Sequence, residues 1–503
     1  MSLAQARLAQ RADPRQYTEA PEGQSIQIPA PSLGMNTRDS VSALDPREAR
    51  LIRNMIAETG RLRIRKGKTS HQTITGASAV GSMWTHEGVS DDVLLAAANG
   101  KIFNVTGAPS ELATGYSLNT WSTAQFNDTT VGVNGTDTPW AFDGSTIGAS
   151  GLSGSGLTIA NLRTVHVVGI RMWFTEEDSA DVWYLDVSAV TGVLTKFNLS
   201  EQTKGGYCVG VYAFGSYTIF VMSSGEIVAY QGDPGSTFTK VKDYKAPKPV
   251  GYNPGLDVAG DLIIMTTSGP LPFEAIAAGL AFDTTALQSW GKIAPSWVAD
   301  FEASGSQAGW NAVFFQGLVI LNVQVDATTS KQWVFNTRGK AWSYFDGLDG
   351  YAFAELGGVL YFGDKASNTI WSYAGGTDDG EAIIATVRGG FSSPFQAQVN
   401  GQYTLARPNI AATGAVNVQI QVDVEYQEAG IEAPEVPLSS SGSGPWDGPW
   451  DGPWGTNGAP ILRWSSVKGF GRAVAVVLQF HSRADDLAYF ATDLVVAPAG
   501  IIG

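Results

Sequence analysis

The chain has 503 residues with a formal net charge of −15 at pH 7, and only 16% of its residues are charged. It is rich in glycine, with 59 residues, and in aromatic residues, with 15 Trp, 16 Tyr and 22 Phe. This length is enough for two or more domains. The composition is typical of sheets joined by tight turns and excludes a mainly disordered chain. The acidity excludes a general nucleic-acid binder, because affinity for phosphates comes from Lys and Arg.

The beginning of the chain is polar. Residues 1–30 contain several prolines, so we expect them to be extended and to become ordered on a partner. The first residues, MSLAQARLAQRADPRQ, lack the apolar stretch of a secretory signal. No apolar run approaches the roughly 20 residues of a membrane helix. We therefore expect no membrane insertion.

A loop, a helix and a basic strand are predicted between residues 31 and 68. Asp45 is suited to cap the helix, Pro46 suits its first position, and Glu48 completes a capping box. The apolar face of the helix would be formed by Ala49, Ile52 and Ile56. Gly60 would end the helix.

The predicted strand carries an unusual concentration of positive charge. Arg61, Arg63 and Arg65 alternate with apolar residues, so they are expected to point to one side. The window from Arg38 to Lys68 holds nine basic and four acidic residues, a net charge of +5, which leaves −20 for the rest of the chain. This asymmetry indicates that one end meets an acidic partner, although solvated basic faces are common.

This region resembles the N-terminal part of tail nozzle proteins of short-tailed phages, also called tail tubular protein B or packaged-DNA stabilisation protein. In that family a GxNTRD loop, a P-x-E-A helix and an R-x-RKG strand precede a large β domain. The matching residues here are Gly34, Asn36, Thr37, Arg38, Asp39, Pro46, Glu48, Ala49, Arg63, Arg65, Lys66 and Gly67. The motif names no chemistry. A capped helix and a solvated basic strand in another β protein are the alternative interpretation.

Residues 75–380 are expected to form a β-propeller. Short apolar runs alternate with Gly, Asn and Asp turns, as in DDVLLAAANGKIFNV, and each unit reads as a strand, a turn and a second strand. At roughly 45 residues per blade the span holds about six or seven blades. Residues 270–299 have a helical character and interrupt a blade. Cys208, the only cysteine, lies in the apolar run GYCVGVYAF and is predicted to be buried, which fits a reducing compartment.

Residues 381–503 are predicted to be a further β domain. Residues 416–425 alternate strictly between apolar and polar, which predicts a half-buried strand, and residues 472–480 form another strand. The fold class is therefore all-β. The resemblance implies that residues 1–74 and 381–503 join into one β-rich platform beside the propeller of residues 75–380.

A low-complexity loop at residues 441–458 repeats Gly-Pro-Trp every four residues and places Trp446, Trp450 and Trp454 at regular intervals. Gly and Pro exclude a helix or a central strand there. Three interpretations remain open: the rings cap an edge of their own domain, they contact another subunit or a tail partner, or they bind sugar.

The sequence contains no recognisable catalytic motif. Its four histidines, His71, His86, His166 and His481, have no metal-ligand spacing, and no phosphate-binding loop occurs. Adjacent carboxylates such as Asp91 and Asp92 would point to opposite faces of a strand, so we interpret them as solvated turn residues. We expect no catalytic residue, no metal and no cofactor, and hence no enzyme.

The resemblance implies a virion structural protein. Nozzle subunits are made in the cytoplasm of the bacterial host and assemble as a hexameric ring below the adaptor ring of the tail. The ring retains packaged DNA and later conducts it out during ejection, without binding it specifically. The implied partners are other copies of the chain, the adaptor ring and tail fibres.

Two sets of residues are expected to form interfaces. The adaptor-side set is Arg61, Arg63, Arg65 and Lys66, and the set for a neighbouring subunit or tail partner is Trp446, Trp450 and Trp454. Two other functions are open: a propeller-type tail glycosidase or lyase, which needs facing carboxylates or a His/Tyr/Arg cluster, and a receptor-binding tail protein whose Trp loop recognises sugar.

Overall fold

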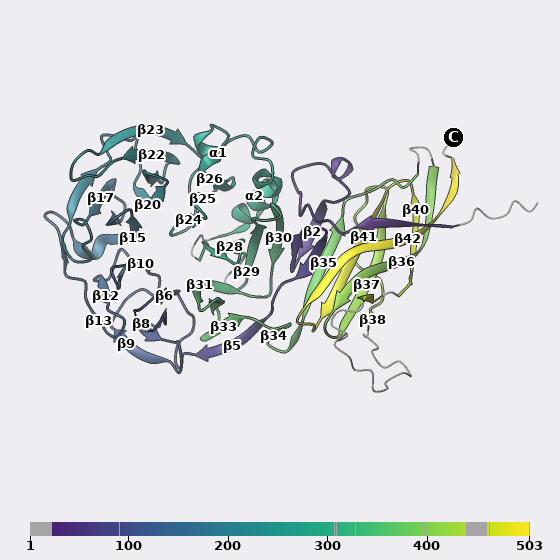
Figure 1. Ribbon diagram of the computed structural model, residues 1–503, viewed down its shortest axis with the longest axis horizontal. Helices are drawn as coiled ribbons and strands as arrows, with labels where there is room; N and C mark the ends of the chain where they lie inside the picture. Colours follow the sequence, from purple (N-terminus) through teal and green to yellow (C-terminus); the bar gives the residue numbers. More distant parts are fainter. Residues whose placement is uncertain are drawn as a thin grey trace, which may run out of the picture.

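The chain is described here by a computed structural model that covers residues 23–438 and 460–501, apart from Ser90, Ser306, Ala308, Ala327, residues 396–398 and Leu462. Small sheets surround one axis, and a two-sheet platform lies at the edge of this circle (Figure 1). Among the described residues, no helix combines the length and the apolar character needed to cross a bilayer.

Seven units of three or four strands form the blades of a β-propeller in the described residues, within the predicted six or seven. Five blades are separate sheets, and the last two are parts of a 14-stranded sheet that continues into the platform. The first four blades are antiparallel and have four strands each. The first blade has β6 (Ser82–His86), β7 (Val93–Ala98), β8 (Lys101–Asn104) and β9 (Ser110–Thr114), and the second has β10 (Ser122–Phe126), β11 (Thr129–Val133), β12 (Trp140–Phe142) and β13 (Ile147–Ala149). The third blade has β15 (Leu162–Val168), β16 (Arg171–Glu176), β17 (Asp181–Tyr184) and β19 (Thr195–Asn198), and the fourth has β20 (Cys208–Phe214), β21 (Tyr217–Met222), β22 (Glu226–Gln231) and β23 (Thr239–Lys245). Short elements join them: β14 (Leu152–Ser153), η2 (Ile159–Asn161) and β18 (Gly192–Val193).

The blades follow from the hairpin pattern of the sequence. Asn99 and Gly100 turn between β7 and β8 with φ angles of 53° and 68°, values that favour Asn and Gly in two-residue hairpins. Cys208 at the start of β20 is buried as predicted, and burial raises the pKa of its thiol to about 12. The turn residues therefore set where each hairpin reverses, and the apolar strand residues pack between the blades.

The fifth blade has three strands followed by a helical segment. Its elements are β24 (Gly255–Val258), β25 (Asp261–Thr266), β26 (Gly269–Pro272), α1 (Phe273–Ala277), η3 (Trp290–Ile293) and α2 (Ala294–Ala303). Phe273 and Ile276 of α1 are buried in the core of this blade and its neighbour. The predicted helical interruption at residues 270–299 is therefore confirmed.

The last two blades adjoin the platform. They consist of β27 (Asn311–Phe315), β28 (Leu318–Gln324), β29 (Ser330–Asn336) and β30 (Ala341–Phe345), and of β31 (Gly350–Leu356), β32 (Val359–Asp364), β33 (Thr369–Tyr373) and β5 (Lys68–Thr73). β5 comes from the N-terminal side of the chain and pairs with β33, so it completes the seventh blade. The predicted boundary at residue 74 places this strand in the platform, whereas the structure places it in the propeller because it pairs with β33.

The platform is built from both ends of the chain, as expected. Its first sheet holds β1 (Gln24–Pro29), β3 (Met55–Glu58), β4 (Arg61–Ile64), β36 (Val399–Ala412), β39 (Pro460–Ile461), β40 (Ser465–Gly471) and β42 (Leu487–Ile501). Its second sheet holds β2 (Ala49–Arg53), β35 (Glu381–Gly389), β37 (Val416–Val424), β38 (Val436–Leu438) and β41 (Val474–Ser482), with β34 (Thr377–Asp378) beside β35. The N-terminal strands β1 and β4 both pair with the C-terminal strand β42.

One apolar core joins the platform and the propeller. In β37, the residues Val416, Val418, Ile420 and Val422 are buried, which confirms the predicted alternation. They belong to a cluster that extends through both platform sheets to the sixth blade. In addition, β2 pairs with β30 of that blade and with β35 of the platform, so the second sheet continues into the propeller.

The predicted helix after Asp45 is wrong. The capping residues form one turn, in which the Glu48 carboxylate accepts from the Asp45 backbone N–H at 3.3 Å and the Glu48 N–H donates to the Asp45 carbonyl at 2.8 Å. The short 3-10 helix η1 (Val41–Ala43) lies before this turn. The chain then extends as β2 and β3, because β2 has two partner strands to pair with, and Gly60 forms the β3–β4 turn.

Candidate functional site

The GxNTRD segment is a tightly bonded loop. The Asn36 amide donates to the carboxylates of Asp39 at 2.7 Å and Glu48 at 3.0 Å. Arg38 pairs with Asp39 at 2.9 Å and donates to the Thr284 carbonyl of the propeller at 2.8 Å. The Arg38 guanidinium and the Asn36 amide hold the pKa of Asp39 at about 2. The loop is therefore ordered by its own charged side chains.

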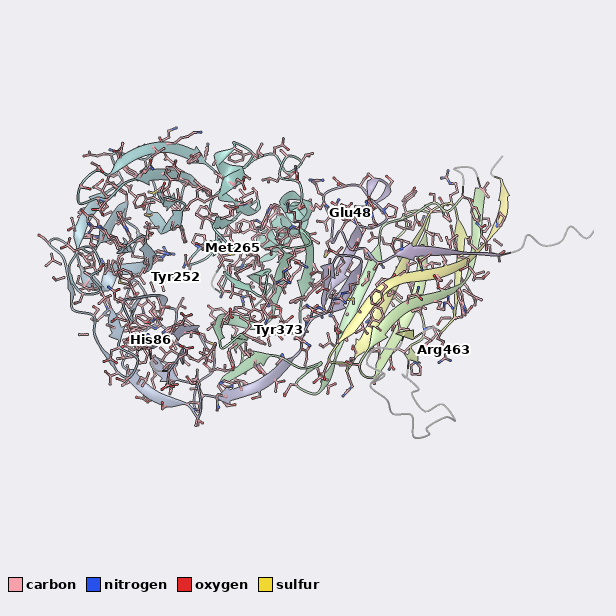
Figure 2. All side chains as sticks on the ribbon, in the orientation of Figure 1. Glu48, His86, Tyr252, Met265, Tyr373 and Arg463 are labelled. Carbon is pink, nitrogen blue, oxygen red and sulfur yellow. The ribbon has the colours of Figure 1, made fainter. Side chains whose placement is uncertain are left out.

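The same loop braces the platform against the propeller. The Thr37 backbone N–H donates to the Lys292 carbonyl at 2.9 Å, and the Lys292 ammonium pairs with Glu48 at 2.7 Å. Figure 2 marks Glu48 where the platform meets the propeller. Gly34 has φ of 82°, and a Cβ on it would lie 2.6 Å from the Trp342 backbone nitrogen. A larger residue would clash there, so the motif residues have a structural role at this junction.

Arg65 does not belong to the surface that the sequence assigned to it. Its side chain is 1% exposed. Its Nη1 and Nη2 donate to the Asp378 carboxylate at 2.8 and 2.7 Å, and Nε donates to the Asn54 side chain at 2.9 Å. The remaining donors reach the carbonyls of Lys66 and Asp346 at 2.9 and 2.8 Å. The expectation that Arg65 points outward with Arg61 is wrong, because Arg65 lies beyond the end of β4 and turns inward.

Asn54 holds the other side of this buried network. It lies between β2 and β3 with φ of 58°, a left-handed conformation that Asn tolerates. Its amide donates to the Asp346 carboxylate at 2.7 Å and to the Ile384 carbonyl at 2.9 Å. Arg53 also pairs with Asp346 at 2.7 Å. The network connects the N-terminal hairpin, the sixth blade and the C-terminal part of the platform.

Arg61 and Arg63 line a groove between the platform and the sixth blade. Both donate to the Glu58 carboxylate at 2.8 Å. The groove has a volume of about 710 Å³ and is also lined by Arg338 of the β29–β30 turn and by the exposed Phe490. We call it the arginine groove. Arg338 is distant in the sequence, and nothing in its turn distinguishes it from other turns, so sequence reasoning missed it.

The other predicted interface residues lie elsewhere. The Lys66 ammonium donates to the Asp485 carbonyl at 2.8 Å, and Lys66 is not among the residues that line the arginine groove. Trp446, Trp450 and Trp454 lie outside the described residues. The structure thus brings together Arg61 and Arg63 from the predicted adaptor-side set and separates Arg65 and Lys66 from them.

The outer face of the first platform sheet carries exposed apolar side chains. In β40, exposed residues alternate with less exposed ones, and Phe470 is 57% exposed. Leu405 of β36 lies opposite the exposed Ser466 in the register and is exposed itself, as is Trp464 before β40. Leu405, Trp464 and Phe470, with the exposed Ser466 and Lys468 between them on β40, form what we call the apolar face.

The outer face of the second platform sheet is covered by the chain itself. Residues 428–435 run across it and form what we call the strap. The Gln419 and Gln421 amides of β37 donate to the strap carbonyls of Ala433 and Gly430 at 2.7 and 2.9 Å. One sheet of the platform therefore has a covered outer face, whereas the other presents the apolar face.

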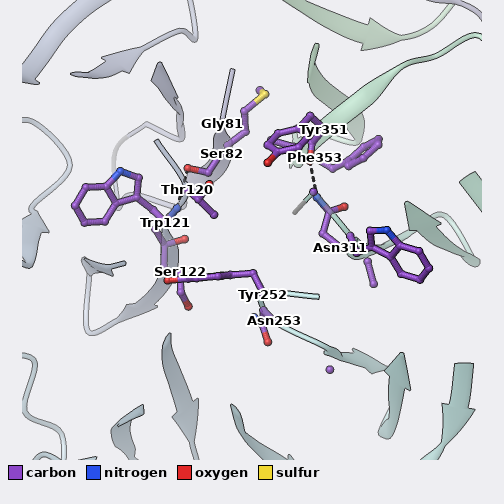
Figure 3. Close-up of a pocket in the computed structure, with 17 residues that line it drawn as sticks. Gly81, Ser82, Thr120, Trp121, Ser122, Tyr252, Asn253, Asn311, Tyr351 and Phe353 are labelled. Atoms are coloured by element: carbon purple, nitrogen blue, oxygen red, sulfur yellow. Dashed lines mark hydrogen bonds between the residues drawn. The ribbon is translucent and has the colours of Figure 1, made fainter. Parts of the chain in front are cut away.

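A cavity of about 210 Å³ lies on the propeller axis, at the starts of the innermost strands of several blades (Figure 3). Ser82 donates to the Asn119 carbonyl at 2.6 Å, and the Asn311 amide donates to the Tyr351 carbonyl at 2.6 Å across neighbouring blades. The described residues that line the cavity include no Asp, Glu, His, Lys or Arg. Hydroxyl, amide and aromatic groups surround this space.

Acidic and imidazole groups are scattered in the described part of the chain. No group of three or more His, Cys, Asp or Glu residues that could hold a metal ion occurs there. His86 is buried and bonds Thr130 at 2.9 Å, while His166 contacts the ring of Tyr212 with centroids 4.7 Å apart. The histidines therefore lie in separate packing environments.

Comparisons with known proteins concern the fold. No protein-family model matches the chain, and no curated protein matches it. Among solved structures, the WD40 β-propeller domain of Doa1 is 8% identical with a TM-score of 0.40, over 61% of this chain and 97% of that one. A mitotic checkpoint complex chain is 9% identical with a TM-score of 0.38, over 61% and 93%. The computationally designed Ika8 protein is 11% identical with a TM-score of 0.36, over 67% and 98%.

Proposed function

We propose that the chain is a virion structural protein, the subunit of a tail nozzle that forms a ring below the adaptor of a short-tailed phage. The ring retains packaged DNA and conducts it during ejection. The observation that carries this proposal is the platform, in which both chain ends are interleaved and one sheet presents the apolar face. The resemblance of residues 31–68 to tail nozzle proteins is the reason for interpreting this platform as part of a nozzle.

The apolar face supports assembly through the platform. Exposed Leu, Trp and Phe side chains on one sheet are costly in water and gain free energy when a neighbour covers them, at roughly 25 cal/mol per Å² of apolar area. The strap already covers the second sheet, so the first sheet is the one available to another copy. A head-to-tail contact whose rotation closes would generate a ring.

Ion pairs within the platform support a channel that lets DNA pass without binding it tightly. Arg65 is buried, Arg388 pairs with Asp423 at 3.1 Å, and Arg407 pairs with Asp493 at 2.6 Å. These cations are neutralised by carboxylates of the same platform, and the chain as a whole is acidic. A channel lined by such paired cations, away from the arginine groove, would hold phosphates weakly, which ejection requires.

The arginine groove is the proposed contact with the adaptor. Three guanidinium groups and one carboxylate line it, so it carries a net positive charge on an acidic chain. An acidic segment of the adaptor would bind there through charge-assisted hydrogen bonds. Tail fibres are further partners that the proposal includes.

Native mass spectrometry of the purified full chain tests the assembly. We expect a closed oligomer, with six subunits as the family implies. The variant Leu405→Ser/Phe470→Ser should remain monomeric, whereas Phe282→Ser, which removes an exposed phenylalanine from the propeller, should assemble normally. A wild-type oligomer that is unchanged by the double substitution would contradict the role of the apolar face.

A further inference from the structure

A second cavity of about 600 Å³ opens beside the central one, near the starts of innermost strands in the third to sixth blades. Tyr252 lines both cavities, and Figure 2 marks it close to the propeller axis. Arg163, Tyr207, Lys248 and Phe301 also line the second cavity. Its volume is within the range of small-molecule sites. Unlike the central cavity, it combines cations with aromatic rings.

The Arg163 guanidinium lies beside two tyrosine rings and a carboxylate at this cavity. Its guanidinium carbon lies 5.1 Å from the Tyr252 ring centroid and 5.8 Å from that of Tyr207, and its Nε lies 3.4 Å from a Glu177 carboxylate oxygen. The Tyr252 hydroxyl donates to the Arg163 carbonyl at 2.6 Å. Burial raises the pKa of Tyr252, so this phenol stays protonated. Two ring contacts and one ion pair thus place the guanidinium at the cavity, while its terminal nitrogens make no hydrogen bond to a described residue.

The terminal nitrogens of Arg163 remain available as hydrogen-bond donors to a ligand. No hydrogen bond joins its Nη1 or Nη2 to any residue that the structure describes, and its Nε has only the Glu177 ion pair. Lys248 is exposed and makes no ion pair with a described residue, while its carbonyl accepts from the Thr267 N–H at 2.9 Å. Two cations thus line one cavity of a chain whose net charge is −15. Glu177 partly balances the charge of Arg163 on its Nε side, and the terminal nitrogens of Arg163 and the Lys248 ammonium are available to bind an anion from outside the chain.

The rest of the lining favours a ring with hydroxyl groups. Phe301 and the tyrosines provide apolar surface, and Ser223, Thr267 and Gln307 provide hydroxyl and amide groups. The polar central cavity adjoins at Tyr252 and offers further hydroxyl and amide partners. A nucleic-acid duplex would need a track of several phosphate contacts, whereas only two cations line this cavity.

We propose that this cavity binds a sugar-sized ring that carries one oxyanion, either a sugar carboxylate or a sugar phosphate. The oxyanion accepts two parallel hydrogen bonds from the terminal nitrogens of Arg163 and is balanced by Lys248. The ring lies toward Phe301 and Tyr252, with its hydroxyl groups near Thr267 and the central cavity. The site is independent of ring assembly, so its failure would leave the proposed function untouched.

Isothermal titration of the full chain with D-glucuronate, glucose 6-phosphate, D-glucose and inorganic phosphate tests this site. We expect saturable binding of at least one of the two sugar anions, and affinities at least tenfold lower for glucose and for inorganic phosphate. Binding of one sugar anion alone would identify the oxyanion. Phosphate that binds as tightly as the sugar anions would overturn the assignment of a sugar site.

Two variants locate the binding. Lys248→Gln should weaken the sugar anion at least fivefold, and Arg163→Lys at least tenfold because it keeps the charge but loses the paired donors. Lys340→Gln, an exposed lysine without an ion pair to a described residue in the β29–β30 turn, is the matched control and should leave the affinity unchanged. Because Lys248 is exposed, its variant should fold normally. The absence of saturable binding, or binding unchanged by both variants, would overturn the proposal.

Discussion

Arg65 and Asp378 form a largely buried bidentate ion pair, with nitrogen–oxygen distances of 2.8 and 2.7 Å and side-chain exposures of 1% and 15%. Arg65 lies where the chain leaves β4 for the propeller strand β5, and Asp378 lies in β34, where the chain returns to the platform. The pair therefore links the two crossings between the platform and the propeller. Its position explains why a basic residue of the N-terminal motif is buried and does not face a partner.

Arg65→Leu should lower the free energy of unfolding by about 1–3 kcal/mol, because the partly buried Asp378 carboxylate loses its charged partner and the Asn54 side chain and Asp346 carbonyl lose a donor. Arg61→Leu is the control, since Arg61 is exposed and such surface changes usually stay within about 0.5 kcal/mol. Denaturant unfolding of both variants measures the difference. Equal effects would show that the buried pair does not hold the junction.

The arginines illustrate what the sequence can predict and what it leaves open. The alternation of Arg61, Arg63 and Arg65 predicts one shared face, and this holds only while the strand continues. β4 ends at Ile64, and two of the partners of Arg65, Asp346 and Asp378, lie 281 and 313 residues away. In the same way the capping signals at Asp45 give one turn, because strand pairing across the chain overrides local helix propensity.

Features that depend on local patterns were predicted well. The blades, the strand at Val416–Val424 and the burial of Cys208 follow from turn residues and from the period of two, which act over a few residues. Arg338 and Lys248 were not predicted as site residues. Each reaches its cavity through a loop whose neighbours come from distant parts of the chain.

Neutralising the arginine groove should weaken attachment to the adaptor without unfolding the chain. In Arg61→Gln/Arg63→Gln, two exposed ion pairs with Glu58 are lost, each worth about 0.2–1 kcal/mol. We expect at least a fivefold loss of affinity for the adaptor ring and a weaker dependence of binding on salt. Lys242→Gln/Lys245→Gln on β23 serves as the control. Wild-type affinity in the groove variant would place the adaptor contact elsewhere.

His166 should make the propeller less stable in acid. Burial lowers its pKa from 6.5 to about 4, and its Nε2 has no partner among the described residues. Between these pH values the unfolded chain binds the proton more readily, so this contribution is complete above pH 6.5 and is lost as the pH falls toward 4. As the pH falls from 7.5 to 4.5, the melting temperature of wild type should fall further than that of His166→Phe. Parallel curves would count against this assignment.

The Trp loop gives a separate prediction from the sequence. Replacing Trp446, Trp450 and Trp454 by Ser should leave the melting temperature of the monomer nearly unchanged and weaken assembly, because three indole rings on a Gly-Pro frame are typical of an interface. Calorimetry of the monomer and sizing of the oligomer measure the two effects. A clear drop in melting temperature with normal assembly would mean that the rings pack in their own domain.

The central claim, that this chain is a ring-forming nozzle subunit, is tested most directly by negative-stain electron microscopy of the purified protein, alone and mixed with the phage adaptor ring. The account predicts pierced rings whose platforms surround the channel and whose propellers lie outside, stacked on the adaptor when it is present. Leu405→Ser/Phe470→Ser should abolish these rings. Isolated monomers under both conditions, at concentrations where the adaptor ring itself is intact, would contradict the claim.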